Sequence, residues 1–300
     1  MNPSLARLFP SIRRSRSGGR SIWLDAWRRW RSNRAAVAAA IVLALLILTV
    51  LFGPLLSPWD AQIPDLDHDS LPPDLARGHW FATDAIGRDL FVRCMIGGRI
   101  SLLVGLLATL VSVLIGVSYG AVAGYYGGRL DSIMMRLVDV LYALPFLFLV
   151  ILLMVFFGRN ILLIFIAIGA INWLDMARIV RGQTLSLKNM PFVEAAEAMG
   201  VEPARIISRH IVPNLAGVVT VYATLTVPQV ILVESFLSFL GLGVQEPLTS
   251  WGALISEGAQ EMETAPWLLV FPGTLLALTL LCLNFLGDGL RDALDPKEHL

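Results

Sequence analysis

The side chains that could carry catalytic chemistry in this chain are few and scattered. The four histidines are isolated, so none forms the HExxH pair that holds zinc on one helix face. No serine lies in the GxSxG elbow of a hydrolase. A phosphate-binding loop needs a lysine directly after glycine, but Lys188 follows Leu187 and Lys297 follows Pro296. The sequence therefore predicts a non-catalytic chain without metal or cofactor, whose energy comes from a partner or an ion gradient.

One polar stretch between two apolar runs has the features of a docking element. This polar segment, residues 189–214, reads NMPFVEAAEAMGVEPARIISRHIVPN. Pro191 can begin a helix, because the missing N–H would be unpaired in a first turn, and Glu194 then lies near the positive end of the helix dipole. Gly200 supplies a left-handed exit. A second helix is predicted to follow and to end near Pro213. We expect two short helices that form a knob fitting a groove on another protein.

The elements that must position this segment are membrane spans. The chain is 56% hydrophobic and 15% charged, with a mean hydropathy of +0.71, which excludes an ordinary soluble domain. About 20 apolar residues cross a core of roughly 30 Å, and an open sheet cannot satisfy its edge groups in lipid. We predict an all-α integral membrane protein with six transmembrane helices, in runs at residues 35–56, 100–128, 140–158, 160–174, 211–233 and 264–287.

The distribution of positive charge predicts the orientation of these spans. Lys and Arg concentrate in the N-terminal arm and after the second, fourth and sixth runs, so those parts are predicted to face the cytoplasm. Both termini and the polar segment are then cytoplasmic. The predicted divisions are a basic arm with an interfacial helix at 1–34, a first span at 35–56, a periplasmic loop at 57–99, a core with five spans at 100–290 and a cytoplasmic tail at 291–300.

Tryptophans near the N-terminus predict the interfacial helix. Trp23, Trp27 and Trp30 fall on one helix face, and Ser21 could cap the helix. Indoles at headgroup depth with arginines around them are typical of a helix that lies in the membrane interface. We interpret this helix as a juxtamembrane anchor.

Acidic residues at the end of the first outer loop raise the question of a cation site. Asp84, Gly87, Arg88 and Asp89 lie close together, but ligands of an EF-hand alternate at every second position. The spacing instead predicts a structural turn with internal Asp–Arg pairing.

An ion-coupled secondary carrier is the alternative from a different class. Such carriers use ionisable groups at mid-membrane, whereas the charged residues here lie near the ends of predicted spans. Glu234 is the best candidate for a functional charge, and the other interpretation of it is a side chain that snorkels to the interface or forms a hydrogen bond between helices.

The polar segment resembles the coupling loop of ATP-binding-cassette importer permeases. That motif has Glu-Ala-Ala, three residues, Gly, and after nine more residues an Ile-x-Leu-Pro ending. His210 and Val212 stand here where the pattern has Ile and Leu. The resemblance assigns ATPase contact to Glu194, Ala195, Ala196, Gly200 and Pro213.

Four further blocks are similar to the oligopeptide, dipeptide and nickel permease group, and in combination to the C-type permease subunit of oligopeptide importers. They are TDAIGRDLFVRCMIGGRISLLVG at 83–105, VRGQTLSLK at 180–188, ESFLSFLGLGVQEP at 234–247 and NFLGDGLRDALDPK at 284–297.

The resemblance implies a type I importer permease fold in a bacterial inner membrane. It also implies half of a translocation pathway for oligopeptides, or for dipeptides or nickel in other members of the group. The implied partners are a second permease in a heterodimer, two cytoplasmic ATPase subunits that bind ATP and Mg, a periplasmic peptide-binding protein and lipid, without nucleic acid. Neither the motifs nor the resemblance singles out residues of the substrate pathway.

Overall fold

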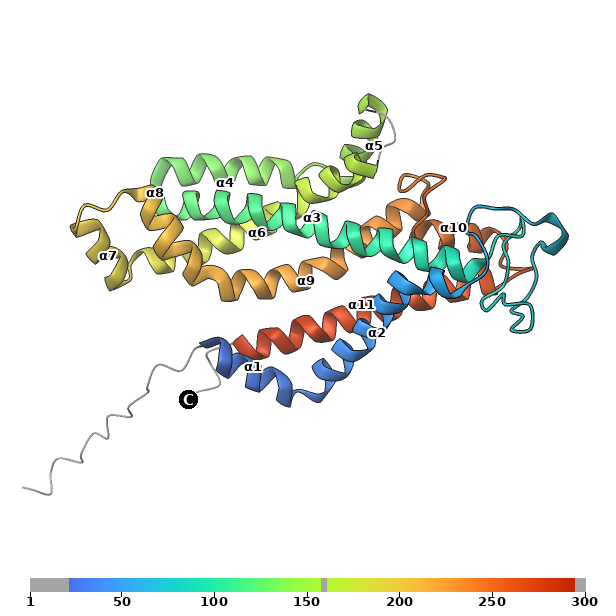
Figure 1. Ribbon diagram of the computed structural model, residues 1–300. Coiled ribbons are helices and arrows are strands. Elements are labelled where there is room, and N and C mark those ends of the chain that lie inside the picture. Colours follow the sequence, from blue (N-terminus) through green and yellow to red (C-terminus); the bar gives the residue numbers. More distant parts are fainter. Residues whose placement is uncertain (1–21, 158–160, 295–300) are drawn as a thin grey trace, which may run out of the picture.

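The computed structural model describes residues 22–157 and 161–294, and almost all ordered structure within them is helical. The exceptions are two isolated β-bridges in the first loop. Figure 1 shows an elongated bundle with α10 (Trp251–Gln260) and the first loop at one end and α7 (Pro191–Ala198) at the other. These are called the α10 end and the α7 end below.

The first two described helices both pack against the last helix. α1 (Ile22–Ser32) contacts α11 (Trp267–Leu294), and α2 (Arg34–Leu56) follows after a cap in which Asn33 Oδ1 accepts from the N–H of Ala35 at 3.1 Å. The helix predicted from the tryptophan pattern is therefore present. The predicted cap Ser21, the arm before it and the tail from residue 295 lie outside the described residues.

The helix that contains the second predicted span begins earlier than its uncharged run indicated. α3 (Leu90–Tyr126) begins at Leu90 instead of Ile100, because the Asp89 carboxylate accepts from the N–H of Val92 at 2.9 Å and caps the helix there. The first loop contains the short 3₁₀-helix η2 (Leu66–His68) and ends at Asp89 rather than at residue 99.

The run predicted as the third span is broken into two helices. α4 (Gly128–Tyr142) and α5 (Phe146–Phe157) are separated at Pro145 and bent by 81°. Proline disfavours helical geometry in the residue before it and cannot donate to the helix, which accounts for a break at this point.

Two long helices complete the bundle. α6 (Ile161–Lys188) packs against α3 along most of its length, and α9 (Val212–Phe239) packs between α3 and α11. Arg181 of α6 donates two hydrogen bonds to the Asp131 carboxylate of α4, at 2.7 and 2.6 Å. Such a bidentate pair fixes the α4–α6 contact in register.

Four helical stretches of the described chain are long and apolar enough to cross a membrane: Arg34–Leu56, Leu90–Tyr126, Pro203–Phe239 and Trp267–Leu294. The bent pair of α4 and α5 makes a fifth if it counts as one span. Helix α6, which contains residues 161–174 of the run predicted as the fourth span, is not in this set.

The core at the α10 end is organised around one tryptophan. Trp251 is fully buried and its Nε1 donates to the carbonyl of Cys94 at 2.9 Å. Gly98 of α3 lies directly under the ring, where a Cβ would come within 2.6 Å of Cζ2 of the indole. Only glycine allows α3 and α10 to approach this closely.

Candidate functional site

The first half of the polar segment has the predicted structure. α7 begins at Pro191 and ends at Ala198, and Gly200 follows with φ +74°, in the left-handed region. A Cβ placed on Gly200 would meet no atom of the described chain within 4 Å. The turn therefore needs glycine for its backbone geometry, while the space around it is open.

The second half differs from the prediction. α8 (Pro203–Ile206) does not end near Pro213 but continues through a π-helical turn, η3 (Ile207–Ile211), into α9. The N–H of Val212 bonds to the carbonyl of Ile207, a five-residue step. This wider turn changes the hydrogen-bond pattern just before Pro213, whose ring would clash with a carbonyl of a regular helix. The polar segment is thus joined to a membrane-length helix without a break.

A buried cluster anchors the polar segment to the bundle. Val193, Ala196 and Ile206 are almost completely buried and pack with residues of α3, α6 and α9. The hydroxyl of Tyr125, at the end of α3, donates to the Glu197 carboxylate at 2.9 Å. A displacement of α7 would therefore be transmitted to three long helices, because close-packed interfaces have little compliance.

The predicted contact residues divide between two faces. Glu194, Ala195 and Gly200 are exposed, and no hydrogen bond or ion pair of the Glu194 side chain occurs within residues 22–157 and 161–294. Ala196 is only 1% exposed and belongs to the anchoring cluster, so it faces inward. Pro213 is exposed but lies beyond the π-helical turn, in the first turn of α9.

Three residues that sequence reasoning missed give the α7 end an apolar surface. Met190, Phe192 and Met199 flank the exposed face of α7, with exposed fractions of 44%, 41% and 76%. Large apolar side chains gathered around a polar knob are typical of a protein interface, and Met adapts its shape readily to a partner. Their position at both ends of a short helix was the only signal available.

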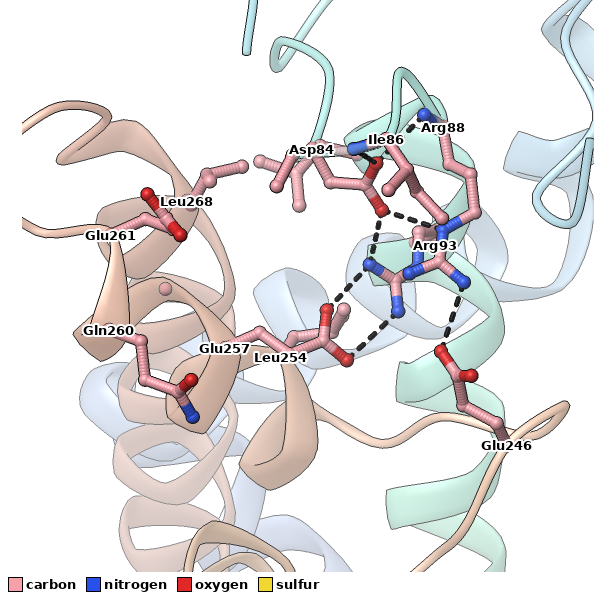
Figure 2. Close-up of a pocket in the computed structure, with 13 residues that line it drawn as sticks. Asp84, Ile86, Arg88, Arg93, Glu246, Leu254, Glu257, Gln260, Glu261 and Leu268 are labelled. Carbon is pink, nitrogen blue, oxygen red and sulfur yellow. Dashed lines mark hydrogen bonds and ion pairs between the residues drawn. The ribbon is translucent and has the colours of Figure 1, made fainter. Parts of the chain in front are cut away.

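At the α10 end, the acidic turn is structural, as predicted. Arg88 Nε bonds to Asp84 Oδ2 at 2.7 Å, and Arg93 donates to the same oxygen at 2.7 Å and to both oxygens of Glu257 at 2.7 and 3.0 Å (Figure 2). Among the described residues, no group of three or more His, Cys, Asp or Glu side chains could hold a metal ion.

Two carboxylates of the first loop have shifted pKa values. The hydrogen bond from His68 at 2.8 Å lowers the pKa of Asp65 below its usual value. Burial raises the pKa of Asp89, against the lowering effects of its cap hydrogen bonds and of His79 at 2.9 Å. The Asp65 carboxylate stabilises the first loop internally, and the Asp89 carboxylate joins His79 of the loop to the start of α3.

Glu234 is a structural polar group between helices. It is fully buried in α9 and accepts hydrogen bonds from Ser101 Oγ of α3 at 3.0 Å and Ser238 Oγ at 2.7 Å. The interpretation as a hydrogen bond between helices is therefore confirmed. A buried carboxylate with several donors is stable, whereas an unpaired one would be very costly.

The sequence was compared with the profiles of known protein families. The profile of the binding-protein-dependent transport system inner membrane component matches residues 100–299, two thirds of the chain. The chain belongs to this family. A second profile, the N-terminal TM domain of oligopeptide transport permease C, matches residues 21–73.

Curated relatives extend the match within the family of binding-protein-dependent inner membrane components. The oligopeptide transport system permease protein OppC of Escherichia coli K12 is 61% identical over 94% of this chain and 93% of its own length. The OppC protein of Haemophilus influenzae is 59% identical over 94% and 90%. The dipeptide transport system permease protein DppC of Bacillus subtilis is 49% identical over 91% and 85%.

A solved structure shares the fold of this family member. A chain of the MetNI methionine ABC transporter, described in inward-facing conformations, aligns with a TM-score of 0.53 and 20% identity over 68% of this chain and 96% of that chain. The prediction of an all-helical permease fold of the type I importers is confirmed in this respect. The family is one of membrane components of transport systems, and its description indicates no catalytic activity.

Proposed function

We propose that the chain is the C-type permease subunit of an oligopeptide importer driven by ATP-binding-cassette ATPases. It forms half of the translocation pathway and receives the conformational signal of ATP binding and hydrolysis at the α7 end. The observation that carries this proposal is the identity of about 60% with two oligopeptide permeases along nearly the whole chain. A dipeptide permease of the same family is 49% identical, so dipeptides are the second candidate substrate.

The coupling step is assigned to the exposed part of α7. Glu194, Ala195 and Gly200 enter a cleft of the ATPase, with Phe192 and Met199 covering its edges. The buried cluster behind them moves α3, α6 and α9 together when the ATPase dimer closes. The polar segment is then a rigid part of a transporter with two conformations, and ATP binding shifts the equilibrium between them.

The membrane arrangement follows from the same assignment. The spans are α2, α3, the pair α4–α5, α6, α9 and α11, six in all, with both termini and the α7 end in the cytoplasm. The charge pattern of the sequence supports this orientation. α1 lies in the cytoplasmic interface with its tryptophans at headgroup depth. A second permease, two ATPases that bind ATP and Mg, and a soluble peptide-binding protein complete the importer, and the chain itself holds no cofactor.

Uptake by a reconstituted complex tests the proposal. Proteoliposomes contain this chain with the second permease and ATPases encoded beside it, and receive the soluble binding protein and labelled peptides of two to six residues. ATP-dependent uptake of the longer peptides is expected, with no ATP hydrolysis by this chain alone. Uptake restricted to dipeptides would transfer the assignment to the second candidate, and uptake driven by an ion gradient without ATP would contradict it.

A further inference from the structure

Two hollows at the α10 end are not used by the proposed coupling mechanism. The first has a volume of about 350 Å³ and the second about 400 Å³, and both are lined by Arg88, Arg93 and Glu246. The bond from Arg88 to Glu246 at 3.0 Å therefore lies between them. The two neighbouring hollows are together called the acidic groove below.

Carboxylates outnumber cations in the first hollow. Asp84 pairs with both Arg88 and Arg93, Glu257 pairs with Arg93, and Glu246 pairs with Arg88. Glu261 lies across the hollow from the two arginines, next to Gln260 (Figure 2). The carboxylate of Glu261 accepts a hydrogen bond only from the Thr264 hydroxyl, at 3.1 Å, among the described residues. The hollow thus keeps negative charge without a counter-cation.

The carboxylates of this hollow are held in place before any partner arrives. Arg93 is 3% exposed and binds Glu257 through two parallel hydrogen bonds, the geometry that fixes a carboxylate most firmly. The rest of the lining includes the apolar side chains of Leu254 and Leu268. An apolar lining with acidic groups matches a lysine or arginine side chain, which has an aliphatic stem and a cationic end.

The second hollow offers an unused hydrogen-bonding group. Thr249 lines it, is 7% exposed, and its hydroxyl has no partner among the described residues. A buried hydroxyl without a partner carries a free-energy cost that a bound polar group would remove.

The surroundings of the groove are acidic as well. Residues 57–89 contain seven Asp against Arg77 and Arg88, and residues 240–266 contain four Glu and neither Lys nor Arg. A surface of one sign steers a partner of the opposite sign toward it and speeds association at low salt.

From this chemistry we infer that the acidic groove receives a basic side chain of the soluble binding protein that docks on the α10 end. The lysine or arginine enters the first hollow beside Glu261, and a polar group of the same segment pairs with Thr249. This inference rests on the proposed function, because it takes the α10 end to be extracytoplasmic and the partner to be a binding protein.

Affinity measurements on the complete complex in nanodiscs test the inference. Glu261→Lys is expected to weaken binding of the soluble binding protein at least tenfold, because it places a cation where the partner's cation binds. Glu261→Gln, which keeps a group able to accept from Thr264, is expected to weaken it severalfold. Glu263→Lys makes the same change of charge on an exposed residue that does not line either hollow, and is expected to have less than a twofold effect.

If Glu261→Lys and Glu263→Lys weakened the affinity for the binding protein equally, long-range attraction would explain the effect, and the inference would be overturned. An affinity unchanged in both variants would also overturn it. Restoration of Glu261→Lys binding by a Lys→Glu change in the binding protein would support it. Direct binding of trilysine to the complex, lost in Glu261→Lys, would assign the groove to the transported peptide instead. A wild-type complex that neither binds a soluble partner nor takes up peptide would contradict the proposed function itself.

Discussion

Gly200 offers the sharpest test of the proposed coupling role, because the strain of its backbone conformation and the contacts of an added side chain can be tested separately. Its φ of +74° lies in the left-handed region, where a side chain costs about 1–2 kcal/mol. A Cβ placed on it would meet no atom of the described residues within 4 Å, so in the proposed complex the added group would face the partner. Strain alone would shift the equilibrium of the turn by a factor of about 5 to 30. It would not unfold the chain, since the buried cluster around Val193 and Ala196 remains.

Three substitutions separate strain from contact. Gly200→Asn adds a side chain that tolerates the left-handed conformation, and Gly200→Asp adds nearly the same volume with a charge. If the turn enters a cleft of the ATPase, both reduce peptide uptake at least tenfold, and Gly200→Ala reduces it less. The assay is ATP-driven uptake in proteoliposomes, together with the abundance of the assembled complex.

A matched control exists at the opposite end of the bundle. Gly241 has φ +73°, and a Cβ placed on it would likewise meet no atom of the described chain within 4 Å. Gly241→Asn therefore introduces the same strain away from α7, and uptake is expected to stay within a few-fold of the wild type. Wild-type uptake by Gly200→Asn at normal abundance would refute the docking of this turn, and equal losses at Gly200 and Gly241 would leave strain as the explanation.

Three further predictions concern contacts elsewhere in the chain. Tyr125→Phe removes the hydrogen bond to Glu197 and should lower the free energy of unfolding by about 1 kcal/mol. It should also reduce peptide uptake per ATP hydrolysed, and an unchanged ratio would contradict a mechanical role for this contact. Glu234→Leu leaves the hydroxyl of Ser101 without its acceptor and should destabilise the complex by about 1–3 kcal/mol in thermal unfolding, more than Glu234→Gln; equal stability of the two variants would contradict the hydrogen-bonded role. The pKa of Asp65 is lowered in the folded chain, so its pairing stabilises the first loop at neutral pH, and this stabilisation is lost as the pH falls below about 4. Limited proteolysis of the first loop should therefore become faster as the pH falls, and Asp65→Asn should remove this dependence. The same pH profile in both proteins would contradict a stabilising role of the Asp65 carboxylate.

Local signals predicted the parts of the fold that depend on local chemistry. The start of α7 at Pro191 and the left-handed exit at Gly200 follow from backbone geometry that only proline and glycine supply so readily. The Asp84–Arg88 pair was predictable because the two residues are four apart and complementary in charge. The family blocks were equally visible in the sequence, and the comparisons confirm the family they indicated.

Features that depend on distant contacts were not predictable. The start of α3 was placed too late because Arg93 and Arg99 interrupt the uncharged run that indicates a membrane helix. Their charges are satisfied by partners far away in the sequence: Arg93 by Glu257, and Arg99 by the carbonyl of Val50 at 2.9 Å. The continuous passage from α8 into α9 was missed because Pro213 usually ends a helix, and no sequence signal announces the π-helical turn before it.

Exposure was the other property beyond the reach of sequence. Ala195 and Ala196 are identical in type, yet one is exposed and the other belongs to the buried cluster. The motif therefore marks the polar segment as a whole, and only the structure separates its exposed residues from those that anchor it to the bundle.

The most direct test of the central claim is a crosslink from the tip of the coupling segment. Met199 is 76% exposed, and the native Cys94 and Cys282 are buried, so Met199→Cys gives a single accessible thiol in the described chain. In the assembled, transporting complex, a thiol-to-amine crosslinker at this position is expected to capture the ATPase subunit, with a yield that changes when ATP is trapped. Met262→Cys, 55% exposed at the α10 end, should capture no ATPase. Absence of the ATPase crosslink from Met199→Cys in a complex that still takes up peptide would contradict coupling through this segment.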